Sequence, residues 1–428
     1  MRLLPSLFVY LGCSVAVAQA PAGNATPTPA AGAPERAVHG RVERLGDLTL
    51  LRVWGTPAER GFAHGKLLAT EIARVAVGEF VARFGSKPAL LDMARKSVER
   101  LIEYPEEVQA ELDGLFDGLQ ASGVDLQMPA LKRSFDRTDL AVANALDVFG
   151  LMGCSGFTLW GDQVEGGGVL TARNFDWPLT GAHLLDGTML LVEHRGAGKA
   201  VCAVTWPGYL GAVTGINRDG AAAFLHVGTG RISMTPRPGS WPTAIAAREL
   251  LAVVDVGTPK TAWQQAEQLL GNTSPPAGFM TRVVLPGAPA GEAPAVVFET
   301  DVAKCVRAAT PDGLCVTTNH FTTRDDGRPA SKDSLERTAL IKQRLGDCLA
   351  GESKVVKPAD AWQALASVQR GNQRFGTLHA LVFRHEPWCF ELRVGEPGEK
   401  GCVPAPSSRR QYRLTREQVF GVGEPGAK

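Results

Sequence analysis

The chain has 428 residues, of which 44% are hydrophobic and 21% charged, and 45 Lys and Arg against 44 Asp and Glu give it a net charge of +1. This apolar content is ample for a buried core in one large domain or two ordinary ones, which excludes a disordered chain. The balanced charge, without a long basic run, argues against a nucleic-acid partner. Eight His residues are scattered without an H-E-x-x-H helix or a paired C-x-x-C, so we expect no metal ion and no cofactor.

The N-terminal residues have the pattern of an export signal. A basic residue precedes an apolar stretch at residues 3–17, which is too short and too interrupted to span a membrane well. Small residues with A-x-A spacing follow, so we expect cleavage after Ala18, with Ala20 as the alternative. Cys13 lies in a weak lipoprotein-like sequence. The prediction is a signal peptide at residues 1–18 and an exported protein, periplasmic or secreted, that is near a membrane only through this signal or a lipid on Cys13.

The first half of the chain is predicted to be mainly helical. Residues 19–40 are rich in Ala, Pro, Thr and Gly, which is typical of a disordered linker. A strand at residues 48–54 is followed by stretches in which apolar residues recur at spacings of three and four. Helices are expected at residues 66–84, 89–102, 106–120 and 140–149. Together they define an N-terminal helical segment at residues 41–153.

Beyond residue 153 the pattern changes to short apolar or alternating runs separated by turns, which predicts antiparallel strands. Strands are expected at residues 156–160, 169–175, 188–194, 200–206, 212–216, 221–227, 281–285, 295–299, 304–308, 314–318, 378–384 and 388–394. Helices are expected at residues 243–254, 261–270, 334–349 and 359–368. Blocks of strands alternating with pairs of helices predict an α+β fold, in which two sheets pack face to face and helices cover them. We assign residues 154–396 to this core and residues 397–428 to a C-terminal tail.

A candidate nucleophile stands at the start of the first of these strands. Cys154 follows Gly153, and a Gly-rich turn at residues 165–168 folds the next strand back beside it. This hairpin is expected to bring Arg173 and Asp176 close to the thiol. A neighbouring cation favours the thiolate, which is the reactive form of cysteine, so the group predicts an activated nucleophile.

The cysteine count is consistent with a free thiol. All eight cysteines except Cys13 follow the signal, and an odd number in an oxidising compartment leaves at least one unpaired. Two pairs that flank turns are candidate hairpin disulfides: Cys305 with Cys315, and Cys389 with Cys402. Buried free cysteines are a common alternative, so the sequence leaves the pairing open.

Six motifs, taken in order, give the chain a resemblance to a known group of enzymes. They are the G-x-x-x-G spacing at residues 61–65, Gly153-Cys154, Arg173-Asn174-Phe175-Asp176, the glycine-rich residues 208–217, Thr318-Asn319-His320-Phe321, and residues 334–337. The sequence resembles the N-terminal-nucleophile (Ntn) hydrolases, specifically the group that contains acyl-coenzyme A:6-aminopenicillanic acid acyltransferases, acid ceramidase and choloylglycine hydrolase. The resemblance covers roughly residues 48–395, most of the predicted domain.

This resemblance implies a four-layer αββα sandwich that is made as one precursor. It also implies that the bond between Gly153 and Cys154 is cleaved autocatalytically into a smaller N-terminal and a larger C-terminal chain, which stay associated. The cut frees the α-amino group of Cys154, whose reference pKa of about 7.7 to 8.0 lets it take the thiol proton without a histidine base.

Roles for the other site residues follow from the matching positions. Cys154 would be the nucleophile and, through its new amine, the base. Asp176 would orient this amine, and Arg173 would hold the thiolate. Asn319 would donate to the oxyanion, where the loss of one donor costs about 100-fold or more in rate. Arg337 would organise the network around the nucleophile.

One position departs from the family pattern. Where relatives have an Asn that helps to form the oxyanion hole, this chain has His226 between two apolar residues. A histidine ring can also donate a hydrogen bond, so His226 is the candidate donor there. Trp177, Trp206 and Tyr209 lie beside the motif strands and are candidates for the wall of the substrate pocket.

Each of these residues also has a structural explanation. Arg173 and Asp176 fit an ordinary ion pair at a strand end, and Asn319 fits a turn cap. Arg337 fits the solvated face of an amphipathic helix, and the aromatic group fits a hydrophobic core. A buried structural thiol would likewise account for Cys154.

The sequence therefore predicts a self-processing cysteine hydrolase that is made as a zymogen and acts on a non-peptide amide. The substrate is expected to be a small N-acyl compound, cleaved through an acyl-thioester on Cys154. Two alternatives stay open: acyl transfer to an amine, as in penicillin acyltransferases, and an exported, non-catalytic binding protein with the same fold. A chain that stays uncut would favour the binding protein, and a product that changes with added amine would favour transfer.

Overall fold

The computed structural model describes residues 36–149, 153–178, 183–231, 233, 235–288, 292–308, 313–371, 375–395 and 410–421. The predicted signal peptide, Cys13, Cys402 and most of the predicted linker lie outside the described residues. Within the described ranges, none of the helices combines the length and the hydropathy that a membrane span requires.

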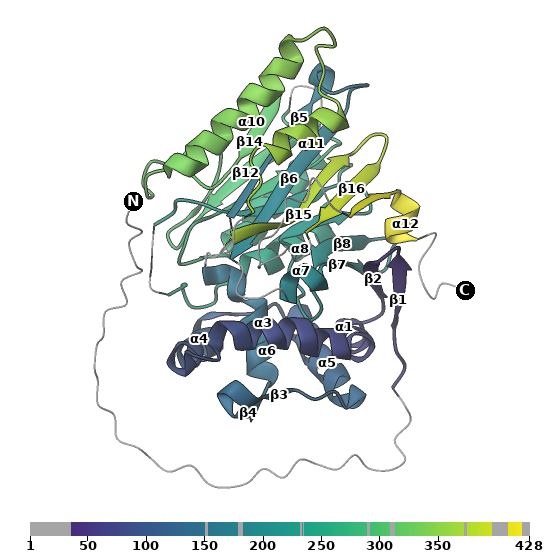
Figure 1. Ribbon diagram of the computed structural model, residues 1–428, viewed down its shortest axis with the longest axis vertical. Coiled ribbons are helices and arrows are strands. Elements are labelled where there is room, and N and C mark those ends of the chain that lie inside the picture. Colours follow the sequence, from purple (N-terminus) through teal and green to yellow (C-terminus); the bar gives the residue numbers. More distant parts are fainter. Residues whose placement is uncertain are drawn as a thin grey trace. The chain divides into compact units, whose positions relative to one another are not determined.

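The N-terminal segment begins with a β-hairpin and continues as a group of helices. The hairpin consists of β1 (Gly40–Leu45) and β2 (Leu48–Val53). The helices are α1 (Pro57–Leu67), α2 (Ala69–Ile72), a π-helical turn (Ala73–Val77), α3 (Gly78–Phe84), α4 (Pro88–Leu101), α5 (Glu106–Ser122), α6 (Arg137–Asn144) and a final 3-10 turn (Leu146–Phe149). The short strands β3 (Gln127–Met128) and β4 (Arg133–Ser134) pair between α5 and α6. Figure 1 shows α1, α3, α4, α5 and α6 gathered together.

The first helix begins earlier than its apolar pattern suggests. Thr56 and Glu59 form a capping box, and Pro57 occupies the first helical turn, where its missing N–H costs nothing. The helix then breaks because Leu68 leaves the helical conformation, at φ −115° and ψ 24°. The helix expected at residues 66–84 is therefore interrupted at Leu68, and beyond this residue α2, the π-helical turn and α3 continue it without a break to Phe84.

Glycines let α1 and α5 pack unusually closely. A Cβ atom at Gly61 would lie 1.9 Å from the Glu111 carbonyl oxygen, and one at Gly65 would lie 2.0 Å from the Leu115 carbonyl oxygen. No side chain fits at such distances, so the G-x-x-x-G spacing on α1 is explained by helix packing.

Nine strands form the larger sheet in the part of the chain that the structure describes. Their order is β1, β2, β7 (Met189–His194), β8 (Ala200–Thr205), β9 (Thr214–Asn217), β10 (Ala222–Val227), β11 (Phe279–Val284), β12 (Ala295–Thr300) and β13 (Cys305–Arg307). Neighbours pair antiparallel except β2 and β7, which are parallel with Leu51 opposite Leu191. The expectation of antiparallel sheets is wrong at this pair. Parallel strands need a long connection, and the whole helical segment lies between β2 and β7 in the sequence.

Six described strands form the smaller sheet, and all of their pairs are antiparallel. Their order is β14 (Leu314–Thr317), β5 (Gly153–Trp160), β6 (Val169–Pro178), β15 (Phe375–Arg384), β16 (Cys389–Val394) and β17 (Gln411–Leu414). β17 and the short helix α12 (Arg416–Phe420) come from the residues that we assigned to a C-terminal tail. Leu414, Val419 and Phe420 are buried against the core, so this part of the tail belongs to the sandwich.

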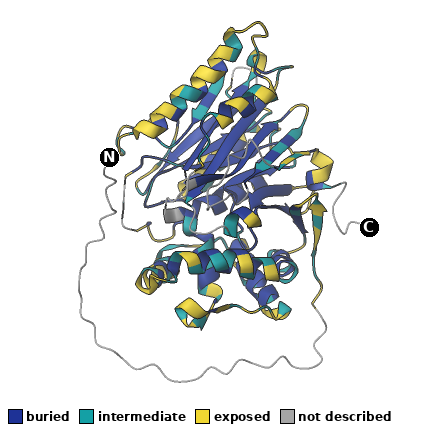
Figure 2. Cartoon of the chain, viewed as in Figure 1, coloured by how far each residue is buried: buried dark blue, intermediate teal, exposed yellow. Residues whose placement is uncertain are grey.

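Four layers result from the packing of these elements. Side chains of both sheets fill the space between them, among them Phe224 of the larger sheet and Phe383 of the smaller. α8 (Thr243–Val253) and α9 (Pro259–Gly271) cover the larger sheet, α10 (Lys332–Ala350) and α11 (Pro358–Ala366) cover the smaller, and the short α7 (His183–Gly187) precedes β7. Figure 2 shows the strands buried along most of their length and the outward side of α10 exposed. The predicted αββα fold class is confirmed.

The cysteine prediction is partly wrong. Cys305 lies in β13 of the larger sheet and Cys315 in β14 of the smaller, so these two strands do not form a hairpin. Neither thiol is bonded to another described cysteine, and the same holds for Cys154, Cys202, Cys348 and Cys389. Because Cys402 lies outside these residues, its pairing with Cys389 stays a prediction.

Candidate active site

Cys154 is the second residue of β5, and its side chain lies between the two sheets. In the ladder with β6, Cys154 is opposite Phe175 and Gly156 is opposite Arg173. Side chains alternate across a strand, so the thiol and the guanidinium share one face. The Sγ atom lies 3.3 Å from the Leu225 carbonyl oxygen of β10, in the other sheet. The residue is completely buried, at 0% exposure.

Arg173 provides the positive charge beside the thiol. Its Nη2 atom donates to Sγ of Cys154 at 3.0 Å and to the Leu225 carbonyl oxygen at 2.7 Å. Its Nη1 atom donates to the Val213 carbonyl oxygen and the Thr214 hydroxyl. Burial raises the pKa of the Cys154 thiol above its ordinary value, and the Arg173 guanidinium acts in the opposite direction.

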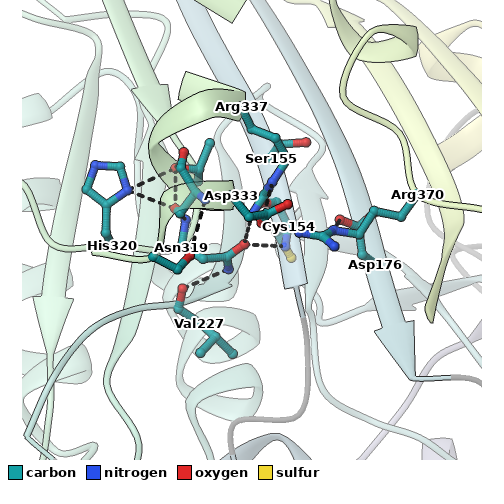
Figure 3. Close-up of polar contacts among 12 residues, drawn as sticks. Cys154, Ser155, Asp176, Val227, Asn319, His320, Asp333, Arg337 and Arg370 are labelled. Atoms are coloured by element: carbon teal, nitrogen blue, oxygen red, sulfur yellow. Dashed lines mark hydrogen bonds and ion pairs between the residues drawn. The ribbon is translucent and has the colours of Figure 1, made fainter. Parts of the chain in front are cut away.

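Asn319 and Arg337 bind the main chain of Cys154 on both sides (Figure 3). Oδ1 of Asn319 accepts from the Cys154 N–H at 3.1 Å and from Nη2 of Arg337 at 2.7 Å. Nη1 of Arg337 donates to the Cys154 carbonyl oxygen at 2.6 Å. Because arginine only donates, the contact between Nη2 of Arg337 and Asn319 identifies the Asn319 atom there as the amide oxygen. The amide nitrogen of Asn319 then donates to the Val227 carbonyl oxygen at 2.8 Å. Arg337 is 7% exposed, so it does not lie on a solvated helix face.

Asp176 lies opposite Gly153 in the β5–β6 ladder. Its Oδ1 atom accepts from the Thr377 hydroxyl at 2.6 Å, and Nε of Arg370 lies 3.6 Å from Oδ2. Oδ2 accepts no hydrogen bond from the described residues. Burial raises the pKa of Asp176, and the contacts with Thr377, Arg337 and Arg370 partly offset this effect. A carboxylate oxygen that can still accept a hydrogen bond therefore stands next to the bond between residues 153 and 154.

Three residues that the sequence analysis missed complete this network. Asp333 accepts from Nη2 of Arg337 at 3.0 Å and also from Arg370, which in turn faces Asp176. Asp333 lies four residues before Arg337 on α10, and this i,i+4 spacing was a usable signal. Arg370 and Thr377 lie outside the recognised motifs. The pairing of β6 with β15 places Thr377 opposite Asp176, and the Thr377 N–H donates to the carbonyl oxygen of Arg370 at 2.9 Å.

Glu299 of β12 fixes the loop that carries Asn319. Its carboxylate accepts hydrogen bonds from the main-chain N–H groups of Thr322, Thr323 and Arg324. Three successive main-chain donors on one carboxylate hold the loop rigidly. A single carboxylate on a strand gives no sequence signal for this role.

His226 lies on β10 between the sheets, but its ring does not contact the thiol through a hydrogen bond. Neither ring nitrogen makes a well-aligned hydrogen bond within the described ranges, and the main chain of Thr318 is a polar neighbour of the ring. Burial and the nearby guanidiniums of Arg173 and Arg282 hold its pKa well below the ordinary value, so the ring is neutral. The neighbouring Leu225 instead contributes its carbonyl oxygen to the surroundings of Sγ.

A cavity of about 60 Å³ is lined by all three predicted aromatic residues, Trp177, Trp206 and Tyr209. Phe175, opposite Cys154 in the ladder, has its ring centroid 5.9 Å from that of Trp177 and 5.6 Å from that of Trp206. The N-terminal segment supplies further lining residues: Ala76, Glu79, Phe80, Ala143, Leu146 and Asp147. Cys154, Trp177 and Trp206 belong to one buried apolar cluster. Two residues of the cavity wall thus pack in the same cluster as Cys154, and the wall is built from residues that precede Gly153 in the sequence as well as from residues that follow Cys154.

No group of three or more His, Cys, Asp and Glu side chains in the described part of the chain is arranged to hold a metal ion. The chemistry that the site offers is that of a thiol, a guanidinium, an amide and a carboxylate. Fold and site together define an αββα protein with a polar network centred on a cysteine.

The chain belongs to the acyl-coenzyme A:6-aminopenicillanic acid acyl-transferase family, whose model matches residues 164–399. The matched range includes Arg173, Asp176, His226, Asn319 and Arg337, and it begins after Cys154. The match confirms the resemblance that the sequence motifs indicated.

Individual relatives share only a low sequence identity with this chain. The Dictyostelium discoideum protein dcd1B is 26% identical over 212 residues, which cover 42% of this chain and 39% of that protein. The solved Caenorhabditis elegans N-acylethanolamine-hydrolyzing acid amidase ortholog is 13% identical, with a TM-score of 0.38, and covers 54% of this chain and 93% of its own. Penicillin V acylase from Agrobacterium tumefaciens is 15% identical, with a TM-score of 0.35, and covers 56% and 83%.

Proposed function

We propose that the chain is a self-processing cysteine amidase that cleaves the amide bond of a small N-acyl compound. The surroundings of Cys154 are the observation that supports this best. Its thiol contacts a buried guanidinium, its main-chain N–H faces Asn319, and Asp176 lies opposite Gly153. A purely structural thiol needs neither a cation nor a carboxylate at this place.

Processing would begin at the bond between Gly153 and Cys154. Sγ adds to the Gly153 carbonyl carbon and the C–N bond breaks, which leaves a thioester and frees the nitrogen of Cys154 as an amine. Water hydrolyses the thioester to a carboxylate on Gly153 and a thiol. Oδ1 of Asn319 already accepts from this nitrogen at 3.1 Å, and Oδ2 of Asp176 can accept as well. Two acceptors would thus orient the amine toward the thiol.

Turnover would use the same groups. The amine takes the thiol proton, and Sγ attacks the acyl carbon of the substrate to form a tetrahedral oxyanion. The Asn319 amide nitrogen has two hydrogens and gives one to Val227, so the other can donate to the oxyanion. The ammonium protonates the leaving amine, and the acyl group remains on Sγ. Water then attacks the thioester with the amine of Cys154 as base, which releases the acid.

The lining of the cavity suits an apolar acyl group. Trp177, Trp206, Phe80 and Leu146 provide apolar wall, and burial of apolar surface is the main source of binding free energy for such a group. The substrate class is therefore an N-acyl amide, such as an N-acyl amino acid, a lipid amide, a bile-salt-like conjugate or the side chain of a β-lactam.

Acyl transfer is the second candidate, and the family match favours it. An amine would then replace water in the last step, and the product would be a new amide instead of a free acid. Added amine acceptors and product analysis distinguish the two reactions.

We also propose that the two chains stay together after the cut and that the protein is exported. The first proposal is supported by β1 and β2, which form one end of the larger sheet, because β2 pairs with β7 beyond the cleavage point. The second is supported by the N-terminal sequence alone.

Intact mass and N-terminal sequencing of purified wild type and Cys154→Ala test the proposal. We expect two chains in the wild type, the larger beginning at Cys154, and a single chain in the variant. Sequencing of the smaller chain reads the signal cleavage site. The wild type is then incubated with a panel of N-acyl amides and analysed for free acid. One uncut chain in both proteins would refute self-processing and favour a non-catalytic binding protein.

A further inference from the structure

The turn at residues 206–210, between β8 and β9, forms one wall of the cavity. Four of its residues line the cavity: Trp206, Pro207, Gly208 and Tyr209. Within the turn, the Tyr209 N–H donates to the Trp206 carbonyl oxygen at 3.1 Å. The other main-chain groups of this buried turn need partners from elsewhere, because unpaired buried polar groups are costly.

The Tyr209 carbonyl oxygen accepts from the hydroxyl of Thr205 in β8 at 3.1 Å, and three further main-chain groups have partners in the N-terminal segment. Asn144, the last residue of α6, donates from Nδ2 to the Gly208 carbonyl oxygen at 2.9 Å and accepts at Oδ1 from the Leu210 N–H at 2.7 Å. His64 of α1 accepts at Nε2 from the Gly208 N–H at 3.0 Å. Both side chains are buried. Two residues that precede the cleavage point therefore determine the conformation of this turn.

The contact between His64 and Gly208 requires a neutral ring, because Nε2 needs a lone pair to accept. Burial lowers the pKa of His64 to about 4, so the ring is neutral at ordinary pH. The approach to Gly208 is also sterically close. Gly208 has φ +86°, and a Cβ atom there would lie 3.2 Å from Cγ2 of Ile72 on α2. The turn thus contacts the N-terminal segment through hydrogen bonds to His64 and Asn144 and through close packing against Ile72.

Asp147 ties the same part of the N-terminal segment to the rest of the protein. Its Oδ2 atom accepts from the Ala244 N–H at 3.0 Å, and the Tyr209 hydroxyl lies 3.3 Å from Oδ1. Asn144 and Asp147 both lie shortly before Cys154 in the sequence. After the proposed cut they would stand near the new C-terminus of the smaller chain and would hold it against the cavity.

We propose that the smaller chain determines which acyl groups the enzyme accepts, because Asn144 and His64 hold the turn whose Trp206 and Tyr209 form the cavity wall. This inference rests on the proposed function. Asn144 and His64 are positioning residues, since their contacts are with the main chain of the turn. A residue that only stabilises the fold would change the stability of the enzyme and leave its order of acyl preference unchanged.

Asn144→Asp tests the proposal without a change in side-chain size. It replaces the amide group that donates to Gly208 with a carboxylate oxygen, and it keeps the acceptor oxygen. Asn217→Asp is the matched control. Asn217 is also buried, donates to the Leu251 carbonyl oxygen at 3.1 Å and accepts from the Ala221 N–H at 2.8 Å, in a turn that does not line the cavity. Asn144→Ser is the second variant if Asn144→Asp does not fold.

Steady-state kinetics are measured on acyl p-nitroanilides from acetyl to palmitoyl, with phenylacetyl added. We expect Asn144→Asp to be cut normally and its Cys154 to react with iodoacetamide like that of the wild type. Its KM for the best acyl group should rise about tenfold, equivalent to about 1.4 kcal/mol, and the preferred acyl group should change. Asn217→Asp should keep the wild-type preference. An equal fall in kcat/KM for every acyl group in Asn144→Asp would overturn the proposal.

Binding of the free acids of the same series, followed by tryptophan fluorescence, separates this inference from the proposed function. If the wild type cleaves no amide, but Asn144→Asp alone changes the order of acid affinities, hydrolysis fails and the inference stands. An unchanged order in Asn144→Asp overturns the inference whatever the activity. A wild type that neither cleaves an amide nor binds an acid overturns both.

Discussion

At the scale of single residues, Arg173 decides whether Cys154 is a reactive or an inert thiol. Burial by itself raises the pKa of the thiol and would leave it protonated, whereas the guanidinium at 3.0 Å from Sγ favours the thiolate. Arg173 is itself buried, and its other acceptors are uncharged oxygen atoms. A thiolate would therefore balance a charge that the fold has already placed there.

Removal of this charge should raise the pKa of the thiol. We expect processed Arg173→Met to react with iodoacetamide at least about tenfold more slowly than the wild type at pH 7, since one pKa unit is a factor of ten in thiolate. The midpoint of its rate–pH profile should move upward, and Arg173→Lys should restore part of the rate. Arg41→Met, which removes an exposed arginine, is the control. An unchanged midpoint in Arg173→Met would argue against this role.

Asp147 and His64 give the folded state opposite pH dependences. Burial raises the pKa of Asp147 from 3.8 to about 6, so stability from its protonated form is present at low pH and is lost as pH rises through 6. Burial lowers the pKa of His64 from 6.5 to about 4, so the unfolded state binds more protons in that window and stability rises with pH. Between pH 4 and 6 the two effects partly cancel.

Asp147→Asn should remove one of these two effects. A shift of about two pKa units corresponds to about 3 kcal/mol. The free energy of unfolding of the variant minus that of the wild type should therefore be up to about 3 kcal/mol larger at pH 7 than at pH 4, so the variant gains relative stability as pH rises. Urea unfolding at both pH values measures this, with Asp162→Asn as the control at an exposed carboxylate. A difference that does not vary with pH would contradict the assignment.

At the scale of elements, the contact between α1 and α5 depends on the absence of side chains. Gly61 and Gly65 on α1 face carbonyl oxygens of α5, and Gly114 on α5 faces the Ala58 carbonyl oxygen, where a Cβ atom would lie at 2.2 Å. Both partners in these contacts are main chain, which cannot rotate away. His64 is on α1, so this packing also places one of the residues that hold the cavity wall.

Gly65→Ala should therefore destabilise the protein by about 3 kcal/mol, the upper part of the range for overpacked cores. Gly271→Ala, at the last residue of α9, is the matched control, because a Cβ atom there meets nothing within 4 Å. Thermal unfolding of both variants checks the contrast. Similar melting temperatures for the two would show that α1 and α5 can separate without cost.

The elements themselves could largely be predicted from the sequence, because they depend on local periodicity. The bounds of β5, β10 and α9 lie within a few residues of those expected. Contacts between strands that are distant in the sequence could not be predicted in this way. The parallel pairing of β2 with β7 and the bulge between Thr377 and His379 on β15 arise from tertiary packing alone.

The same division holds for the candidate site. Cys154, Arg173 and Asp176 stand in one hairpin, whose geometry follows from its turn and strand period, so their proximity could be anticipated. Arg370 comes near Asp176 only through its contact with Thr377 of β15. His64 lies within the G-x-x-x-G spacing and Asn144 in an apolar helix, and neither pattern indicates a contact with the turn at residues 206–210.

At the scale of the whole molecule, a buried group of charges links the two parts that processing would separate. Arg248 of α8 lies 3.0 Å from Glu111 of α5, 2.8 Å from Glu193 of β7 and 3.0 Å from Glu249. Glu111 precedes the cleavage point, and the other three residues follow it. The side chains of Arg248, Glu111 and Glu193 are at most 2% exposed, so salt in the solvent screens their interaction little.

The two chains of the processed wild type should therefore elute together from a size-exclusion column even at high salt. Arg248→Met should weaken their association, because it leaves Glu111 and Glu193 buried without their shared cation, and breaking a buried ion pair in this way costs about 3–5 kcal/mol. Lys332→Met, which removes one partner of the exposed pair with Glu336, should change nothing. Separation of the wild-type chains at high salt would show that solvent ions do screen this group of charges. An Arg248→Met protein as stable as the wild type would show that the β2–β7 pairing holds the chains together without them.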